Sequence, residues 1–192
     1  NSCSFSGSSS SSAYFPYGGL LQVTEDGKYQ TDWSVQTSNS NRFNPKSLTV
    51  DSNNDIYIGG VFTDSIDFDN NVGIQSGGNE DGFLVKALSN GSWGWAISLG
   101  GTSYDGIIDI DMLENNTIGV TGMKTNTISV GLNTLASNGR AFVAVANTAG
   151  GWVWAAQMNN DQQNPDYSYA RAITKSANNT LIVAGDLVES TT

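Results

Sequence analysis

Residues 53–60 read NNDIYIGG, and the same pattern returns as NNTIGVTG at 115–122 and as NNTLIVAG at 178–185. In each copy an Asn-Asn pair precedes a run of apolar residues that ends in glycine. Asparagine tolerates the left-handed backbone of a tight hairpin turn, and alternating apolar side chains are typical of a strand. The pattern therefore predicts a turn followed by a strand, with no helix, at three places: 56–62, 118–122 and 180–185.

Other landmarks keep the same step along the chain. Tryptophan recurs at intervals of 62 and 59 residues, and an apolar residue lies twelve positions before each tryptophan: Trp33, Trp95 and Trp154, with Leu21, Phe83 and Phe142. Three glycines that end the apolar runs are spaced by 62 and 63 residues: Gly60, Gly122 and Gly185. Self-similarity at a fixed period indicates a repeat architecture, here with a unit of about 60 residues.

One unit contains the pattern of four strands. In the best-preserved copy we expect them at 47–51, 55–62, 82–88 and 93–99, with a long connection over 63–80. Apolar residues fall on both faces of these strands, which indicates a sheet that is covered on both sides. Tandem four-stranded antiparallel sheets packed face to face are the blades of a β-propeller. The predicted fold class is therefore all-β, with propeller-like blades in a possibly partial propeller.

The strand count divides the chain into segments. Residues 1–13 include five consecutive serines, and we expect a flexible N-terminal segment there. Residues 14–192 form the predicted propeller domain, made of a half blade at 14–46, blades at 47–106 and 107–169, and a half blade at 170–192. Three outcomes can complete the halves: closure within the chain, further residues that continue the propeller, or head-to-tail pairing of molecules. Closure into three blades is disfavoured, because propellers usually need at least four.

The best-preserved unit resembles the bacterial β-propeller repeat (SBBP) family. The matching positions are Asp51, Asn53, Asn54, Ile56 to Gly60, Asp67, Phe68, Gly77, Gly78, Asp81, Phe83, Gly91, Trp95, Gly100, Gly101 and Asp105. The next copy departs from this pattern, with Arg140 at the position of Asp81. The resemblance implies a secreted or surface-exposed protein, often a repeat region of a larger one. It implies no activity common to the family.

Composition argues against several partners. Charged residues make up 14% of the chain, and 18 acidic against 8 basic residues give a formal net charge of −10. Such a surface repels phosphate backbones and anionic lipids, so we expect no nucleic-acid partner. No window approaches about 18 consecutive apolar residues, so we expect no membrane insertion. Cys3 is the only cysteine, which leaves an unpaired thiol or an intermolecular bridge.

Candidates for catalysis are few. The chain contains no histidine, which excludes Ser-His-Asp and Cys-His constellations and histidine zinc ligands. Carboxylates cluster at Asp109 and Asp111, and at Asp64, Asp67 and Asp69. A glycosidase needs such a pair, but acidic β proteins commonly carry pairs of this kind on solvated edges. We therefore predict that the protein is not an enzyme and that it has no cofactor.

Calcium is a further possibility that the sequence leaves open. Oxygen-rich segments occur at 51–55 (DSNND) and 67–71 (DFDNN), and calcium prefers oxygen ligands. Both segments lack the glycine at position six and the distal glutamate of an EF-hand loop. The alternative is that these side chains form Asx turns.

Two kinds of surface feature suggest carbohydrate. Trp93 and Trp152 each lie two residues before a periodic tryptophan, so we expect the indoles of each pair on one strand face, with Trp93 and Trp152 available to stack on sugars. Glycosylation sequons occur at three predicted hairpin turns: Asn90, Asn115 and Asn178.

Two function classes remain. The first is an extracellular structural or adhesive protein of the cell surface, whose partners are copies of itself in a filament or surface layer, or other surface components. The second is a carbohydrate-binding, lectin-like propeller whose partners are glycans. The acidic, Ser/Asn/Thr-rich composition without a concentrated aromatic site favours the first class.

Overall fold

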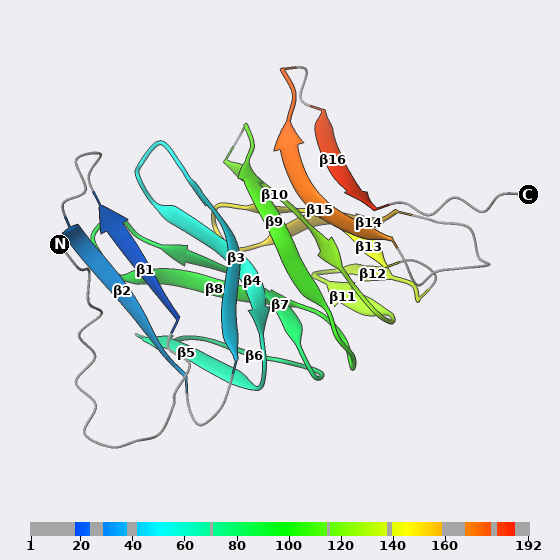
Figure 1. Cartoon of the computed structure of the whole chain (residues 1–192), viewed down its shortest axis with the longest axis horizontal. Coiled ribbons are helices and arrows are strands. Elements are labelled where there is room, and N and C mark those ends of the chain that lie inside the picture. The colour runs from blue at the N-terminus through cyan, green and yellow to red at the C-terminus, as the bar shows by residue number, and fades with distance from the viewer. Residues whose placement is uncertain are drawn as a thin grey trace, which may run out of the picture.

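The structure of the chain is a computed structural model that describes residues 18–23, 29–37, 42–69, 71–114, 116–137, 140–158, 168–177 and 180–186. The described residues form strands and turns only, which confirms the predicted all-β class. The strands are arranged as an elongated array of sheets, with the first and last hairpins at opposite ends (Figure 1).

Two four-stranded antiparallel sheets form the centre of the array and are propeller-like blades. The first blade has the order β3-β4-β7-β8 and the second has the order β9-β10-β13-β14. The strands of the first are β3 (Phe43–Val50), β4 (Ile56–Phe62), β7 (Asp81–Ala87) and β8 (Trp93–Leu99). Those of the second are β9 (Gly106–Met112), β10 (Thr117–Met123), β13 (Ala141–Asn147) and β14 (Trp152–Gln157). The described sheets do not close into a barrel, which is consistent with propeller-like blades in a partial propeller.

The three strands predicted from the NNDIYIGG pattern are present. They are β4, β10 and β16 (Leu181–Asp186), and each is the second strand of its sheet. Asn54 and Asn116 have φ values of 62° and 55°, which is the left-handed turn conformation expected of the Asn-Asn pairs. The third pair, at 178–179, lies outside the described residues.

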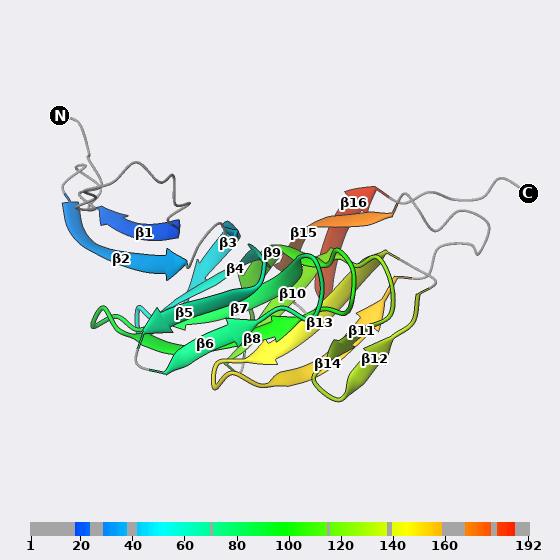
Figure 2. The same cartoon turned by 90° about the horizontal axis from the view of Figure 1, so that it is seen from below.

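Each of the two complete sequence units also contains a short hairpin outside its four-stranded blade, which the prediction of four strands missed. In the first unit this hairpin is β5 (Ser65–Asp69) and β6 (Val72–Gln75), inside the predicted connection. In the second it is β11 (Ile128–Val130) and β12 (Asn133–Leu135). Both are inserted between the second and third strands. In Figure 2 the first hairpin lies beside β8 and the second lies beside β14.

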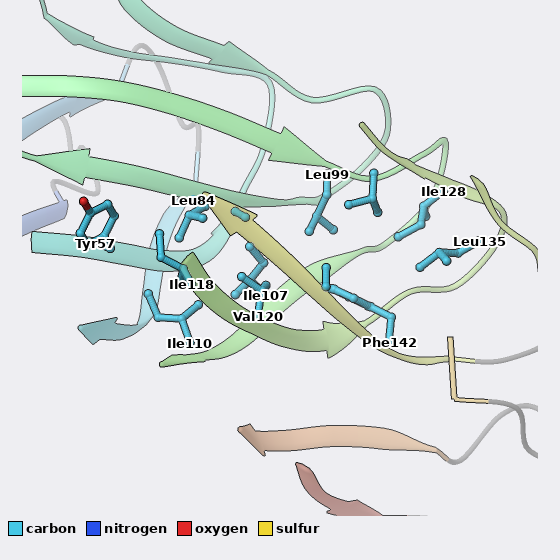
Figure 3. Packing of buried hydrophobic residues seen from close by; sticks show 13 residues of the cluster. Tyr57, Leu84, Leu99, Ile107, Ile110, Ile118, Val120, Ile128, Leu135 and Phe142 are labelled. Atoms are coloured by element: carbon cyan, nitrogen blue, oxygen red, sulfur yellow. The ribbon is translucent and has the colours of Figure 1, made fainter. Parts of the chain in front are cut away.

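The main core lies between the two blades. Tyr57 and Leu84 of the first blade face Ile118 and Phe142 of the second, and all four are fully buried (Figure 3). The β11–β12 hairpin closes this core with three further residues: Ile128, Val130 and Leu135.

The opposite face of the first blade has its own core. Phe43 stacks on Phe83 with ring centroids 4.6 Å apart, and Phe68 of the β5–β6 hairpin packs on Trp93 at 5.1 Å. The first blade is therefore apolar on both faces and covered on both, as the strand pattern predicted.

Two further sheets lie toward the ends of the array: a two-stranded half sheet, and a four-stranded sheet in which the first hairpin of the chain joins β5 and β6. At one end β1 (Gly18–Val23) pairs with β2 (Tyr29–Thr37), and β2 continues onto β5. At the other end β15 (Tyr169–Lys175) pairs with β16. The first hairpin differs from the blades in one respect, because Leu21 pairs with Asp32 whereas its sequence counterpart Phe83 pairs with the more distant Ser98. The β1–β2 pairing is thus shifted by four residues relative to the sequence period.

Gly60, Gly122 and Gly185 have a common packing role. Each lies beside a register shift in the first strand of its sheet, where the neighbouring backbone comes close. A Cβ on Gly122 would collide with the Gly106 carbonyl oxygen and lie 3.1 Å from the Cα of Ile107. A Cβ on Gly60 would lie 2.8 Å from the Cα of Pro45. These glycines are required by close backbone approach, and Gly60 lies within β4 rather than at its end.

We expect Gly122→Ala to lower the free energy of unfolding by about 2 kcal/mol or more, because the added methyl group meets backbone atoms that cannot move aside. Urea unfolding followed by circular dichroism measures the change. Gly94→Ala is the matched control, since its Cβ would meet only side-chain atoms, the nearest 3.3 Å away, and its cost should stay within about 0.5 kcal/mol. Equal costs for the two variants would contradict the packing role.

Candidate functional site

Only one of the three sequons can be placed. Asn90 is exposed in the turn between β7 and β8, where its Oδ1 accepts hydrogen bonds from the backbone N–H of Ser92 at 3.0 Å and from its hydroxyl at 2.7 Å. Gly91 has a φ of 90° and allows this turn. A sugar attached at Asn90 would face solvent. Asn115 and Asn178 lie outside the described residues.

The tryptophan pairs do not share a strand face as predicted. A β-bulge in β8 pairs Trp95 with Lys86 and Trp93 with Ala87, which leaves Gly94 as an extra residue. One extra residue reverses the alternation of side chains, so Trp93 packs in the core beside β5–β6 and Trp95 packs on the core between the blades. A bulge in β14 separates Trp152 and Trp154 in the same way.

The two indoles predicted to bind sugars are largely occupied. Trp93 is 8% exposed and its ring packs on Phe68. Trp152 packs against the core between the blades, and its Nε1 donates a hydrogen bond to the carbonyl of Ser98 at 3.2 Å. Trp154, by contrast, is 40% exposed. The structure therefore presents Trp154, rather than Trp93 or Trp152, to a ligand.

The DSNND segment forms an Asx turn. Oδ1 of Asp51 accepts the backbone N–H groups of Asn53 at 2.8 Å and Asp55 at 3.0 Å, and Oδ2 accepts the hydroxyl of Tyr57 at 2.9 Å. Both carboxylate oxygens are thus used within the fold. The described residues contain no group of three or more Asp, Glu, Cys or His side chains placed to hold a metal.

Asp55 belongs to a buried ion pair in the same region. Its carboxylate lies 2.9 Å from Nζ of Lys86 and also accepts the N–H of Ser89 at 2.9 Å. Burial acts to raise the pKa of Asp55, but the hydrogen bonds from Lys86 and Ser89 outweigh it and lower that pKa below its usual value. This pair joins β7 to the turn before β4.

Asp109 and Asp111, the candidate catalytic pair, connect neighbouring sheets. Asp109 Oδ1 accepts the hydroxyl of Ser47 on β3 at 2.6 Å, and its Oδ2 accepts the N–H of Ile173 on β15 at 2.8 Å. Asp111 accepts the hydroxyl of Thr174 at 2.9 Å. The side chains therefore hold three first strands together and do not lie on a solvated edge.

A second carboxylate pair was not recognised from the sequence and is more deeply buried. Asp81 and Asp105 are 3% and 2% exposed. Each accepts the N–H of a glycine four residues earlier, Gly77 at 2.6 Å and Gly101 at 2.8 Å. The two glycine loops also bond to one another, through the N–H of Asp105 and the carbonyl of Glu80 at 2.7 Å. The shared spacing of glycine and aspartate was the available signal.

Asp81 is in an unfavourable environment for a charge. Its Oδ1 has no hydrogen-bond partner among the described residues, and it packs against Gly100. Burial raises the pKa of Asp81 to about 6, and the nearby Asp105 carboxylate adds to the rise. Lys124 is also fully buried, and burial lowers the pKa of its ammonium group while the charge of Asp105 opposes that change.

A candidate interaction surface lies at the C-terminal end of the array, beside the β15–β16 hairpin. A hollow of about 300 Å³ lies between the second blade and the β15–β16 hairpin. Trp154 and Val153, which is 52% exposed, line it together with Lys175 and Glu114, whose charged groups are 3.9 Å apart. We call these residues, together with Leu181 in the hollow and the free edge of β16, the C-terminal surface.

At the boundary between the two blades, the place that corresponds to this hollow is filled. Trp95 Nε1 donates to the carbonyl of Thr148, in the turn between the third and fourth strands of the second blade, at 3.0 Å. Gly150 of that turn lies against the Trp95 ring, because a Cβ there would be 2.9 Å from the indole. Next to the last half sheet, the described residues contain no such turn, and Trp154 is left open.

The N-terminal end of the array likewise has exposed apolar side chains and, among the described strands, an unpaired strand edge. Leu48 and Val50 on β3 are 54% and 46% exposed, on the face opposite to Ser47 and Thr49, which contact β9. None of the described strands pairs with the outer edge of β1. We call this edge and the two β3 residues the N-terminal surface.

Compared with known proteins, the chain matches no family model and no curated protein. None of the described segments forms a helix long and apolar enough to cross a membrane.

Asp81→Asn removes one ionisable group and keeps an oxygen that can accept the Gly77 N–H. Folding raises the pKa of Asp81 from 3.8 to about 6, so between these values the folded state holds a proton that the unfolded state has lost. The stability that protonated Asp81 contributes is complete below about pH 4 and is lost as the pH rises through about 6. We expect Asp81→Asn to gain roughly 2 kcal/mol relative to wild type between about pH 4 and pH 7, by urea unfolding.

Asp64→Asn is the control for this measurement. Asp64 is exposed with a φ of 56°, a conformation that asparagine also tolerates. Its stability relative to wild type should change far less over the same pH range. If the difference in the free energy of unfolding between Asp81→Asn and wild type did not change with pH, the buried carboxyl would not take up a proton on folding.

Proposed function

We propose that the chain is an extracellular structural or adhesive protein of the cell surface, whose blades are scaffold and which assembles with copies of itself into a filament or surface layer. The observation that carries the proposal is the pair of open ends. Among the described residues, β16 corresponds to the second strand of a blade, and no third strand pairs with it. β1 corresponds to the third strand of a blade, and no second strand pairs with it. Each end offers what the other lacks.

The placement of the ends favours assembly between molecules. The β1–β2 and β15–β16 hairpins lie at opposite ends of the array in both views (Figures 1 and 2), so one molecule cannot join them to each other. A contact between two different surfaces produces a ring when the rotation closes and a filament when it does not. Open sheet edges also recruit strands from other chains unless something covers them.

The sequence supports an extracellular location for this scaffold. The resemblance to the SBBP family implies a secreted or surface-exposed protein, and the Asn90 sequon is exposed on a turn. The many carboxylates serve the fold at several points, because Asp51, Asp55 and Asp109 each hold backbone or side-chain donors in place. The proposal therefore assigns them no catalytic role.

The mass of the 192-residue chain in solution tests the proposal. We expect light scattering after size-exclusion chromatography to give masses that are multiples of the single chain and that rise with concentration, because the contact is between molecules. A mass of one chain across the whole range, up to about 0.5 mM, would contradict self-assembly. The range reaches typical affinities of weak strand-mediated contacts.

A carbohydrate-binding propeller is the second candidate, favoured by the exposed Trp154 beside the hollow. Sugar rings stack on open indoles, and the charged groups of Lys175 and Glu114 could bond hydroxyl groups. A glycan array compares wild type with Trp154→Ala, and with Trp93→Ala and Trp152→Ala as variants of occupied indoles. We expect no binding that depends on Trp154. Binding lost only in Trp154→Ala would support the lectin function.

A further inference from the structure

Resting on the proposed function, we propose which contact joins the copies: β1 of one molecule adds antiparallel to the edge of β16 of another that no described strand occupies, next to the hollow over Trp154. The C-terminal surface is thus the seat of a third strand, which β1 at the N-terminal surface of a second copy supplies. Strand addition to an open edge is a common mode of recognition.

The hydrogen-bonding groups of β16 are oriented for this addition. The N–H of Ser176 donates to the carbonyl of Thr180 at 2.8 Å, which fixes the hydrogen-bonded pairs of the β15–β16 ladder. These pairs alternate in an antiparallel ladder, so the pair of Ile173 with Val183 is a non-hydrogen-bonded one. The N–H and carbonyl of Val183 therefore point away from β15, toward the free edge.

The second blade shows how such an edge is used. On β10, Val120 lies opposite Ile110 in the same kind of pair, which the Leu113 N–H and Thr117 carbonyl establish at 2.8 Å. The outward groups of Val120 meet Ala144 on β13, the third strand. Val183 presents the same groups at the equivalent place, and β1 has the place of β13.

The packing of a second strand against the first strand of the next sheet is repeated from one boundary to the next. A Cβ on Gly59 of β4 would meet Ile110 of the next sheet at 2.8 Å, and one on Gly119 of β10 would meet Ile173 at 3.2 Å. The half sheet β15–β16 therefore packs on the second blade as the second packs on the first. Among the described strands, none pairs with the outer edge of β16.

The hollow over Trp154 lies next to this edge, because Leu181 of β16 lines it. Between the blades, the turn of Thr148 and Gly150 gives its carbonyl to the Trp95 N–H and places glycine on the ring. A strand added to β16 therefore borders the hollow that contains Trp154.

Two variants and their matched controls test the contact by sedimentation equilibrium. Val183→Pro removes the outward N–H without removing a bond to β15, as proline on an edge strand can, whereas Val183→Ala keeps that N–H. We expect Val183→Pro to raise the dissociation constant of the assembly about 100-fold and Val183→Ala less than about 5-fold. Trp154→Ala should raise it about 30-fold, and Tyr104→Ala, an exposed aromatic outside both surfaces, should leave it unchanged.

Hydrogen exchange of the wild-type chain gives a readout that does not depend on the folding of a variant. Amides of residues 181–186 should gain protection as concentration rises, because an added strand takes up their outward groups. Assembly of Val183→Pro like wild type, equal losses in Val183→Pro and Val183→Ala, or assembly without protection of 181–186 would overturn this contact and leave self-assembly standing. A wild-type chain that stays single at all concentrations would overturn both proposals.

Discussion

A sheet with apolar side chains on both faces needs a neighbour on each side, and this requirement shapes the whole chain. The first blade presents Tyr57 and Leu84 on one face and Phe62 and Phe83 on the other. Fully burying one such side chain contributes about 1.5–3 kcal/mol, whereas an exposed ion pair such as Arg171 with Asp186 contributes about 0–1 kcal/mol. Packing between sheets therefore outweighs surface charge, and the inserted hairpins exist where that packing would otherwise be incomplete.

Much of the fold could be predicted because local patterns determine it. The Asn-Asn turns and the alternation that follows them locate β4, β10 and β16 within one or two residues. The β5–β6 and β11–β12 hairpins were missed, because each strand has only three to five residues and few apolar side chains. Ile66 and Phe68 gain their importance from the neighbouring sheet, which the local sequence does not reveal.

The site residues were harder to predict, since they depend on where one strand meets another. A single extra residue at Gly94 places Trp93 and Trp95 on opposite faces, and a sequence pattern of i and i+2 cannot show a bulge. The sequence also does not show which aspartates are buried: Asp81 is enclosed in the structure, while Asp64 is exposed. The open ends could be anticipated by counting strands, but the direction of the Val183 N–H depends on the register of the β15–β16 ladder.

The bonds made by Asp109 determine how the array responds to tension. Along the first strands, neighbouring sheets are joined by side-chain bonds to Ser47 and Ile173 instead of a continuous backbone ladder. A pull along the long axis therefore loads these few bonds and the apolar packing before it loads the ladders within a sheet. The boundaries extend first, one after another, while each blade keeps its strands paired.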